Sequence, residues 1–222
     1  MRAVGHIRAL LVLALCWHPL VSAMETGPRE VVEKAANEVI EILRQDGDNI
    51  RSNPDEIYEL ANEFILPLFD FDKMSYFVLG KVWQQATAQQ KLDFQREFKQ
   101  LLISTYATAL AGFKTDEEIV YQKVMVSPKN ENIAIVPSEV RRKGAGPIAV
   151  AYRMIRADGA WRIYDVVIDG VSLVTNYRAN FASKLRSGGL DSLITNLNEH
   201  NKTESQPRDA AKVTVQPASQ TQ

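Results

Sequence analysis

A strand that runs directly into a helix is the feature of this chain that most limits its fold. β-Branched and aromatic residues fill positions 161–168, a composition typical of a strand. Asp169-Gly170 then supplies a turn signal. Apolar side chains follow at helical spacing, at Val174, Tyr177, Phe181 and Leu185. The strand and the helix thus present apolar surface and no catalytic group, which is typical of a binding protein.

The first 23 residues have the pattern of a cleavable export signal. Arg2 and Arg8 flank the start of an apolar run, and the small residues at 21–23 suit a cleavage site. The alternative is a membrane anchor, but the apolar run is too short to span a bilayer. We therefore expect a signal peptide over residues 1–23 and a soluble exported protein that begins near Met24.

Removal of that segment would limit the available chemistry. It carries Cys16, the only cysteine, and two of the three histidines, which leaves His200. Thiolates and disulfides would then be absent. Histidine is also the usual general base near neutral pH and the commonest metal ligand. A hydrolase or a zinc enzyme is therefore not expected, whereas catalysis by carboxylates alone stays open.

The charge balance argues against a nucleic-acid partner. The chain has 26 basic and 27 acidic residues, and loss of Arg2 and Arg8 would change its formal charge from −1 to −3. The basic residues form no stripe of the kind that tracks a phosphate backbone. One basic cluster, Arg141-Arg142-Lys143, fits either a solvated hairpin end or a contact with a lipid headgroup or an acidic partner.

Helical patterns fill the first half of the mature chain. The apolar stripe from Val32 to Leu43 predicts one helix. Asn53 can cap a second helix, which Pro67 interrupts, and Asp72 can cap a short third one. The longest helix is expected at 88–111, on a wide apolar face.

After Gly112 the pattern changes to the alternation of strands. Short turns separate the strands, so consecutive strands should be antiparallel. The four expected strands are 118–126, 132–141, 148–156 and 161–168. Helices, a four-stranded meander and further helices predict a single α+β domain over residues 24–200, with a polar, disordered tail at 201–222. A curved antiparallel sheet that is covered by helices can be solid or can hold a pocket, and the residue pattern leaves both open.

Three local blocks carry a family resemblance. They are Leu79-Gly80-Lys81-Val82-Trp83; Phe94 and Phe98 ahead of Leu101-Leu102 and Tyr106; and Tyr164-Asp165-Val166-Val167 leading through Gly170-Val171-Ser172-Leu173-Val174 to Asn176-Tyr177-Arg178 and Phe181. Together these blocks resemble the MlaC family, the periplasmic phospholipid-binding components of the Mla transport system, also called toluene-tolerance proteins. The match covers roughly Val31 to Leu197. Val82 stands where a larger aromatic residue is expected, and the C-terminal tail lies outside the pattern.

The resemblance implies a carrier in the periplasm of a Gram-negative cell. Such a protein holds the acyl chains of a phospholipid in a deep apolar pocket and leaves the headgroup toward solvent. It exchanges lipid with an inner-membrane MCE-domain hexamer of an ABC transporter and with an outer-membrane lipoprotein–porin complex, and so maintains the lipid asymmetry of the outer membrane. On this basis we expect a monomer that contacts membranes transiently, with phospholipid as cargo, no cofactor and no catalysis.

We expect the inward faces of the strands and the stripe of the long helix to line this pocket. The expected lining residues are Phe98, Leu102, Tyr106, Val150, Tyr152, Met154, Trp161, Ile163, Val167, Val171, Val174, Tyr177 and Phe181. Trp83 fits either this wall or a structural plug. Asp165 fits a hydrogen-bonded structural role or the pocket mouth, and Arg178 fits a surface salt bridge or a contact with a headgroup or partner.

Two other functions stay open at the level of the residues. An exported α+β enzyme would use Asp165 or Asp169 beside another ionisable group in a cleft. An envelope adaptor protein would have a filled core and no ligand.

Overall fold

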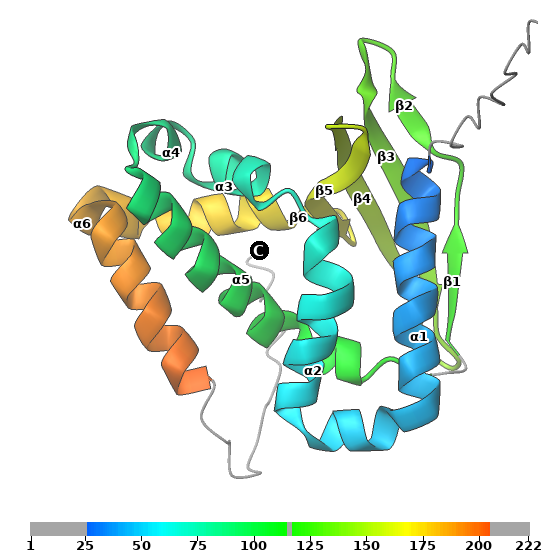
Figure 1. The fold of residues 1–222 in the computed structure, drawn as a ribbon. Helices are drawn as coiled ribbons and strands as arrows, with labels where there is room; N and C mark the ends of the chain where they lie inside the picture. Colours follow the sequence, from blue (N-terminus) through cyan, green and yellow to red (C-terminus); the bar gives the residue numbers. More distant parts are fainter. Residues whose placement is uncertain (1–25, 115–116, 205–222) are drawn as a thin grey trace, which may run out of the picture.

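Helices flank one antiparallel sheet in a computed structural model that describes residues 26–114 and 117–204 (Figure 1). The helices are α1 (Pro28–Ser52), α2 (Pro54–Leu60), the π-helical turn η1 (Ala61–Ile65), the 3₁₀ turn η2 (Leu66–Leu68), α3 (Phe71–Leu79), α4 (Lys81–Gln85), α5 (Ala88–Ala111) and α6 (Leu173–Glu204). The strands are β1 (Glu118–Tyr121), β2 (Met125–Ser127), β3 (Asn130–Arg141), β4 (Ile148–Ala157), β5 (Ala160–Ile168) and β6 (Val171–Ser172). This mixed architecture agrees with the α+β prediction, and the predicted signal peptide lies outside the described residues.

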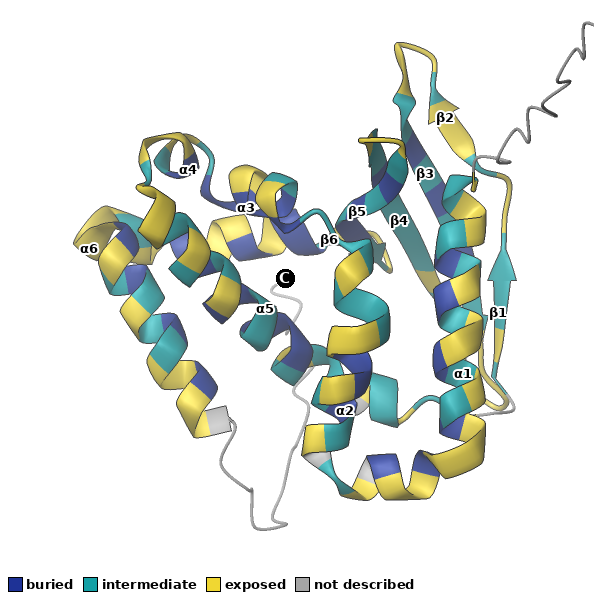
Figure 2. Ribbon diagram, viewed as in Figure 1, coloured by how far each residue is buried: buried dark blue, intermediate teal, exposed yellow. Residues whose placement is uncertain are grey.

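The first two helices form an antiparallel pair beside the sheet. Residues at helical spacing from Val32 to Leu43 bury one face of α1, as the stripe predicted, and Figure 2 shows this buried face along the helix. The backbone of α1 bends at Asp46, where φ is −137°. The Asn53 side chain then accepts a hydrogen bond from the Asp55 backbone N–H at 3.2 Å, which confirms Asn53 as the cap of α2.

The end of α2 and the start of α3 depend on local backbone chemistry. The helix changes to π and 3₁₀ turns from Ala61 to Leu68, around Pro67, where an interruption was predicted. The cap of α3 is Asp70 and not Asp72: Asp70 Oδ1 accepts from the Lys73 N–H at 2.8 Å. The Asp70 N–H donates to the Ile163 carbonyl at 2.8 Å, so β5 holds this residue outside the helix and α3 begins directly after it. Gly80 ends α3 at a φ of 59°.

The sheet has six strands in the described residues, so the prediction of four strands is wrong. Its order is β1-β3-β4-β5-β6, and β2 also pairs with β3. The predicted strand 118–126 is divided into β1 and β2, which both pair with β3. Pro137 of β3 explains the break. It accepts from the Gln122 N–H at 2.9 Å but has no N–H to donate back, so the ladder is interrupted there. The sixth strand, β6, is two residues long.

A β-bulge in β5 changes which side chains face the helices. Arg153 of β4 pairs with Asp165, and Met154 pairs with Ile163, so Tyr164 is an extra residue without a partner position in β4. One extra residue reverses the alternation of a strand. Before the bulge the inward positions of β5 are odd-numbered, and after it they are even-numbered.

The two long helices pack along each other through aromatic rings. Phe98 stacks on Phe94 with ring centroids 5.4 Å apart and meets Tyr177 of α6 edge-on at 5.2 Å. Phe181 of α6 lies 6.2 Å from Phe94, and Trp83 of α4 closes the cluster. These buried rings form the core of the contact between α5 and α6.

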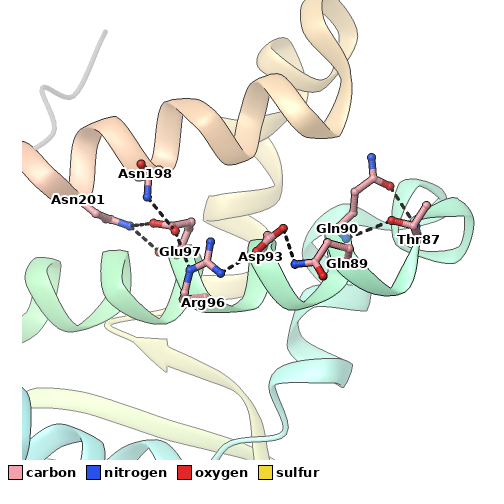
Figure 3. A network of polar contacts seen from close by, with 8 residues as sticks. All are labelled: Thr87, Gln89, Gln90, Asp93, Arg96, Glu97, Asn198 and Asn201. Carbon is pink, nitrogen blue, oxygen red and sulfur yellow. Dashed lines mark hydrogen bonds and ion pairs between the residues drawn. The ribbon is translucent and has the colours of Figure 1, made fainter.

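A buried carboxylate of α5 binds the second part of α6, which follows a bend at Gly189 (Figure 3). Glu97 of α5 is 4% exposed and accepts hydrogen bonds from the Asn198 and Asn201 amides of α6, at 3.0 and 2.9 Å. Arg96 donates to the same carboxylate at 3.0 Å. We expected a disordered tail from Asn201, but α6 continues through Glu204 and Asn201 is buried. The rest of the expected tail lies outside the described residues.

Candidate functional site

An apolar cavity lies between α1, the segment from α2 to η2, α5 and the sheet. It has two compartments, one of about 330 Å³ against α5 and β4, and one of about 200 Å³ beneath α1. Five side chains border both compartments, so the two spaces adjoin. These shared residues are Ile65, Phe69, Leu110, Phe113 and Tyr152.

Among the residues that the structure describes, the walls of both compartments carry no charged side chain. The larger compartment is bordered by Ala61, Ile65, Leu66, Phe69, Phe71, Leu102, Ile103, Tyr106, Ala107, Ala109, Leu110, Phe113, Val150, Tyr152, Val166, Ile168 and Leu173. The smaller one adds Val32, Ala35, Ala36, Val39, Ile40, Leu43, Leu68, Ile119 and Ile163. Among the described residues of these walls, the polar side-chain atoms are the tyrosine hydroxyls of Tyr106 and Tyr152. Burial raises the pKa of Tyr106 to about 12 and also raises that of Tyr152, so both phenols stay neutral.

The cavity follows from a change of residue size along α5. The first half of this helix presents Phe94 and Phe98 to the aromatic rings of α6, with ring centroids 5.2 to 6.2 Å apart. The second half places the small residues Ala107 and Ala109 among larger cavity-lining side chains such as Tyr106 and Leu110. Small side chains where neighbouring backbones stay apart leave space unfilled.

Five of the thirteen expected lining residues border the cavity. They are Leu102, Tyr106, Val150, Tyr152 and Ile163. A sixth, Trp161, borders an open cleft next to the cavity, together with Lys34 and Arg162. The alternating face of β4 and the stripe of α5 thus identified part of the wall, because both elements were predicted in the correct register.

The other seven expected residues lie elsewhere. Phe98, Met154, Val174, Tyr177 and Phe181 belong to the solid core, where the rings of α5 and α6 fill one another's space. Val167 faces away from the cavity because the bulge at Tyr164 reverses the faces of β5, and Val166 and Ile168 border the cavity instead. Val171 is 57% exposed in the short strand β6.

The sequence reasoning missed the contribution of α1 and of the turns after α2. Val39 and Leu43 of α1, and Ile65 and Phe69 beyond α2, all border the smaller compartment. The signal was present in the apolar stripe of residues 32–43 and in the dense apolar run around Pro67. Neither pattern shows by itself that these two segments face each other across a space.

Asp165 has a structural role in this geometry. It is 1% exposed and borders neither compartment. Its carboxylate accepts from Arg153 Nη1 at 3.0 Å, Ser172 Oγ at 2.7 Å and the Val174 N–H at 3.1 Å. These bonds join β4, β5, β6 and the first turn of α6. The hydrogen-bonded interpretation of Asp165 therefore holds, and it does not form the mouth of the cavity.

The remaining ambiguous residues also lie outside the cavity wall. Trp83 is buried against Phe94, which matches the structural plug. Arg178 is exposed beside Gly80. Asp169 lies in the exposed turn after β5 and accepts from the Ala149 N–H at 3.0 Å. In the described part of the chain, no cluster of histidine and carboxylate side chains could hold a metal ion, and no helix is long and apolar enough to cross a bilayer.

Comparison with known proteins places this fold among phospholipid-binding proteins. The family model "MlaC protein" matches residues 33–199. The intermembrane phospholipid transport system binding protein MlaC of Haemophilus influenzae is 25% identical over 177 residues, which cover 79% of this chain and 82% of the relative. The toluene tolerance protein ttg2D of Pseudomonas putida is 27% identical over 188 residues, covering 83% and 84%.

A solved structure shows the same fold with a ligand. The phospholipid-binding protein from Ralstonia solanacearum, in complex with a phospholipid, matches with a TM-score of 0.73 and 30% sequence identity, over 80% of this chain and 98% of that one. Proteins of this family bind and transport phospholipid and are not enzymes. Since the family model spans most of the chain and the fold agrees, the chain belongs to the MlaC family.

Proposed function

We propose that this chain is a periplasmic phospholipid carrier that holds acyl chains in the apolar cavity and leaves the headgroup toward solvent. The observation that carries the proposal is the cavity wall, whose described residues are aliphatic, aromatic and tyrosine side chains without a charge. It occurs in a chain that is 30% identical to a protein solved with a phospholipid. Both compartments together fall in the range of ~300–1,000 Å³ that is usual for ligand sites.

The energetics of lipid transfer suit such a wall. Each buried methylene contributes about 0.8 kcal/mol, so two acyl chains with roughly 30 methylenes represent on the order of 24 kcal/mol of gross transfer energy. A carrier must shield a comparable apolar area, or the lipid stays in its bilayer. It must also release the lipid, and apolar contacts are non-directional, so a wall without charges supports both steps.

The wider transport role is part of the same proposal. We infer that the chain exchanges phospholipid with an inner-membrane MCE-domain hexamer of an ABC transporter and with an outer-membrane lipoprotein–porin complex, and so maintains outer-membrane lipid asymmetry. Membership of the MlaC family supports this role, as does the name of the Haemophilus influenzae relative, an intermembrane phospholipid transport system binding protein. The carrier would act as a monomer with transient membrane contact and would need no cofactor.

Lipid analysis of the purified chain tests the carrier function. The protein is secreted into a Gram-negative periplasm from its own N-terminal segment and examined by native mass spectrometry. We expect bound phospholipid at about one molecule per chain. Ligand-free protein that also takes up no lipid from phospholipid vesicles would contradict the proposal.

A pair of variants on neighbouring strands tests the location of the cargo. Val150 borders the cavity, whereas Val167 lies on the opposite face of the sheet. Val150→Trp should therefore fill the cavity and reduce lipid loading by more than half. Its lipid-free melting temperature should stay within about 4 °C of the wild type, because the indole enters existing space.

Val167→Trp is the matched control and should load lipid like the wild type. Loading is measured by native mass spectrometry and stability by thermal unfolding. Equal losses of loading in the two variants would show that Val150 is ordinary core rather than part of a lipid-binding wall.

A further inference from the structure

One hydroxyl in the sheet is buried without a hydrogen-bond partner among the described residues. It is the Oη atom of Tyr121, the last residue of β1. A buried polar group that makes no hydrogen bond is rare in folded proteins and unfavourable. A ligand atom that accepts a hydrogen bond from the Tyr121 hydroxyl would remove this cost.

Tyr121 lies in an open cleft next to the apolar cavity. It shares the inward face of β1 with Ile119, two residues earlier. Tyr121 borders an open cleft beside α1, and Ile119 and Ile40 border both that cleft and the smaller cavity compartment. Tyr121 borders this cleft, which carries charged side chains such as Glu33 and Lys34, but neither cavity compartment, so its side chain lies on the cleft side of the boundary between the two spaces.

The surroundings of this hydroxyl keep it a donor. Burial is the main reason that the pKa of Tyr121 lies far above its ordinary value, and the nearby Tyr152 and Glu33 add to the effect. The Arg29 guanidinium lies over the Tyr121 ring, 5.5 Å from the ring centroid. Arg29 also pairs with Glu33 at 3.0 Å on the exposed surface of α1. A neutral phenol and a guanidinium, both donors, therefore lie together on the cleft side of this boundary.

A bound phospholipid has its acceptor oxygens at the matching position. Ester and phosphate oxygens lie between the acyl chains, which need the apolar space, and the headgroup, which needs water. We propose that the Tyr121 hydroxyl donates a hydrogen bond to an ester or phosphate oxygen of the bound lipid and sets the depth to which the lipid enters. This inference rests on the proposed carrier function and adds one directional contact to an otherwise non-directional site.

Tyr121→Phe tests the contact because it removes only the hydroxyl. Wild type and variant are stripped of lipid and titrated with vesicles of ester-linked phosphatidylethanolamine. The variant should bind about tenfold more weakly, a factor that corresponds to about 1.4 kcal/mol. Its lipid-free melting temperature should equal or exceed that of the wild type, because no intramolecular hydrogen bond is lost.

Tyr164→Phe is the matched control, since Tyr164 contacts Phe77 of α3 and borders neither compartment. It should bind lipid like the wild type. The proposal is overturned if Tyr121→Phe also binds like the wild type, or if lipid-free Tyr121→Phe melts at a clearly lower temperature, which would reveal a structural bond. Failure of the wild type itself to bind lipid would instead refute the carrier function.

Two further binding measurements identify the lipid atom that accepts the hydrogen bond. If it is an ester carbonyl, the wild type should bind ether-linked phosphatidylethanolamine about as weakly as the variant binds the ester lipid. If it is a phosphate oxygen, the ether lipid should bind the wild type normally, and Arg29→Gln should weaken binding of both lipids. Each result supports the hydroxyl as donor and locates its partner.

Discussion

Glu97 shows how a single buried charge can hold two helices together. Burial opposes the ionised form of this carboxylate, but hydrogen bonds from Asn201, Asn198 and Arg96 outweigh that effect, and its pKa lies below the ordinary 4.5. Asn198 and Asn201 come from the last turns of α6, well after the ring residues Tyr177 and Phe181 along the chain. Glu97 therefore stabilises the part of α6 that no ring contact anchors.

This arrangement predicts a pH-dependent loss of stability in Glu97→Gln. A carboxylate whose pKa is lowered by folding stabilises the protein above its unfolded pKa, and the contribution is lost as the pH falls through the folded pKa. The variant should lose about 2 kcal/mol of unfolding free energy at pH 7. The difference from the wild type should shrink as the pH falls below about 4.5.

Urea unfolding of both proteins between pH 3 and pH 7 measures this difference. Asp93→Asn, one helical turn earlier on the surface of α5, is the control and should change stability very little. A Glu97→Gln deficit that stayed constant over the whole pH range would contradict the proposed role of the charge.

At the scale of elements, Asp165 joins the sheet to the helix that follows it. It accepts hydrogen bonds from β4, from β6 and from the first turn of α6. The three donors converge on one buried carboxylate, so the turn from β5 into α6 has a defined path. The junction is what positions the rings of α6 against α5.

Asp165→Asn should accordingly destabilise the fold without abolishing a chemical activity. We expect a loss of about 2 kcal/mol in unfolding free energy, because an amide keeps the shape but bonds less strongly to Arg153 and to the backbone. Lipid loading at 10 °C should remain near the wild-type level.

Asp169→Asn is the control for this change, because asparagine can still accept from the Ala149 N–H and tolerates the φ of 47° at this position. Both variants are compared by chemical unfolding and by native mass spectrometry. A large loss of lipid in folded Asp165→Asn would show that this carboxylate acts on the cargo after all.

For the whole molecule, α1 closes one side of the cavity mainly through apolar side chains. Between residues 28 and 45 its described polar contacts lie within the helix, apart from Arg29 over the Tyr121 ring. The buried face of this segment rests partly on the cavity. By contrast, α5 and α6 are joined by packed rings and by the Glu97 network.

Hydrogen exchange should reveal this difference. In lipid-free protein, amides of residues 31–43 should exchange faster than those of β4, because few interactions oppose local opening of α1. Lipid that fills the cavity should slow exchange in residues 31–43 by about tenfold or more and leave β4 nearly unchanged. Equal protection of α1 and β4 in lipid-free protein would contradict this picture.

Much of the fold could be predicted from local patterns. The helix at 88–111, the Asn53 cap and three of the four strands follow from spacing and capping chemistry, which act over a few residues. The error at α3 shows the limit. Asp70 and Asp72 are equally good caps in the sequence, and a hydrogen bond from Asp70 to Ile163 of β5 decides between them. That bond links residues that are far apart in the chain.

The candidate site depended more strongly on tertiary structure. By itself the sequence determined an α+β chain with apolar helix faces, a single cysteine, three histidines and the resemblance to MlaC proteins. Only the tertiary structure decided which apolar residues enclose space: Phe98 meets the rings of α6 and is solid core, whereas Ala107 faces a gap. It also decided that Val166 rather than Val167 faces the cavity, through one extra residue at Tyr164. Periodicity specifies which residues share one face of a helix or strand. Contacts between distant segments decide what packs against that face and which strand residues point toward it.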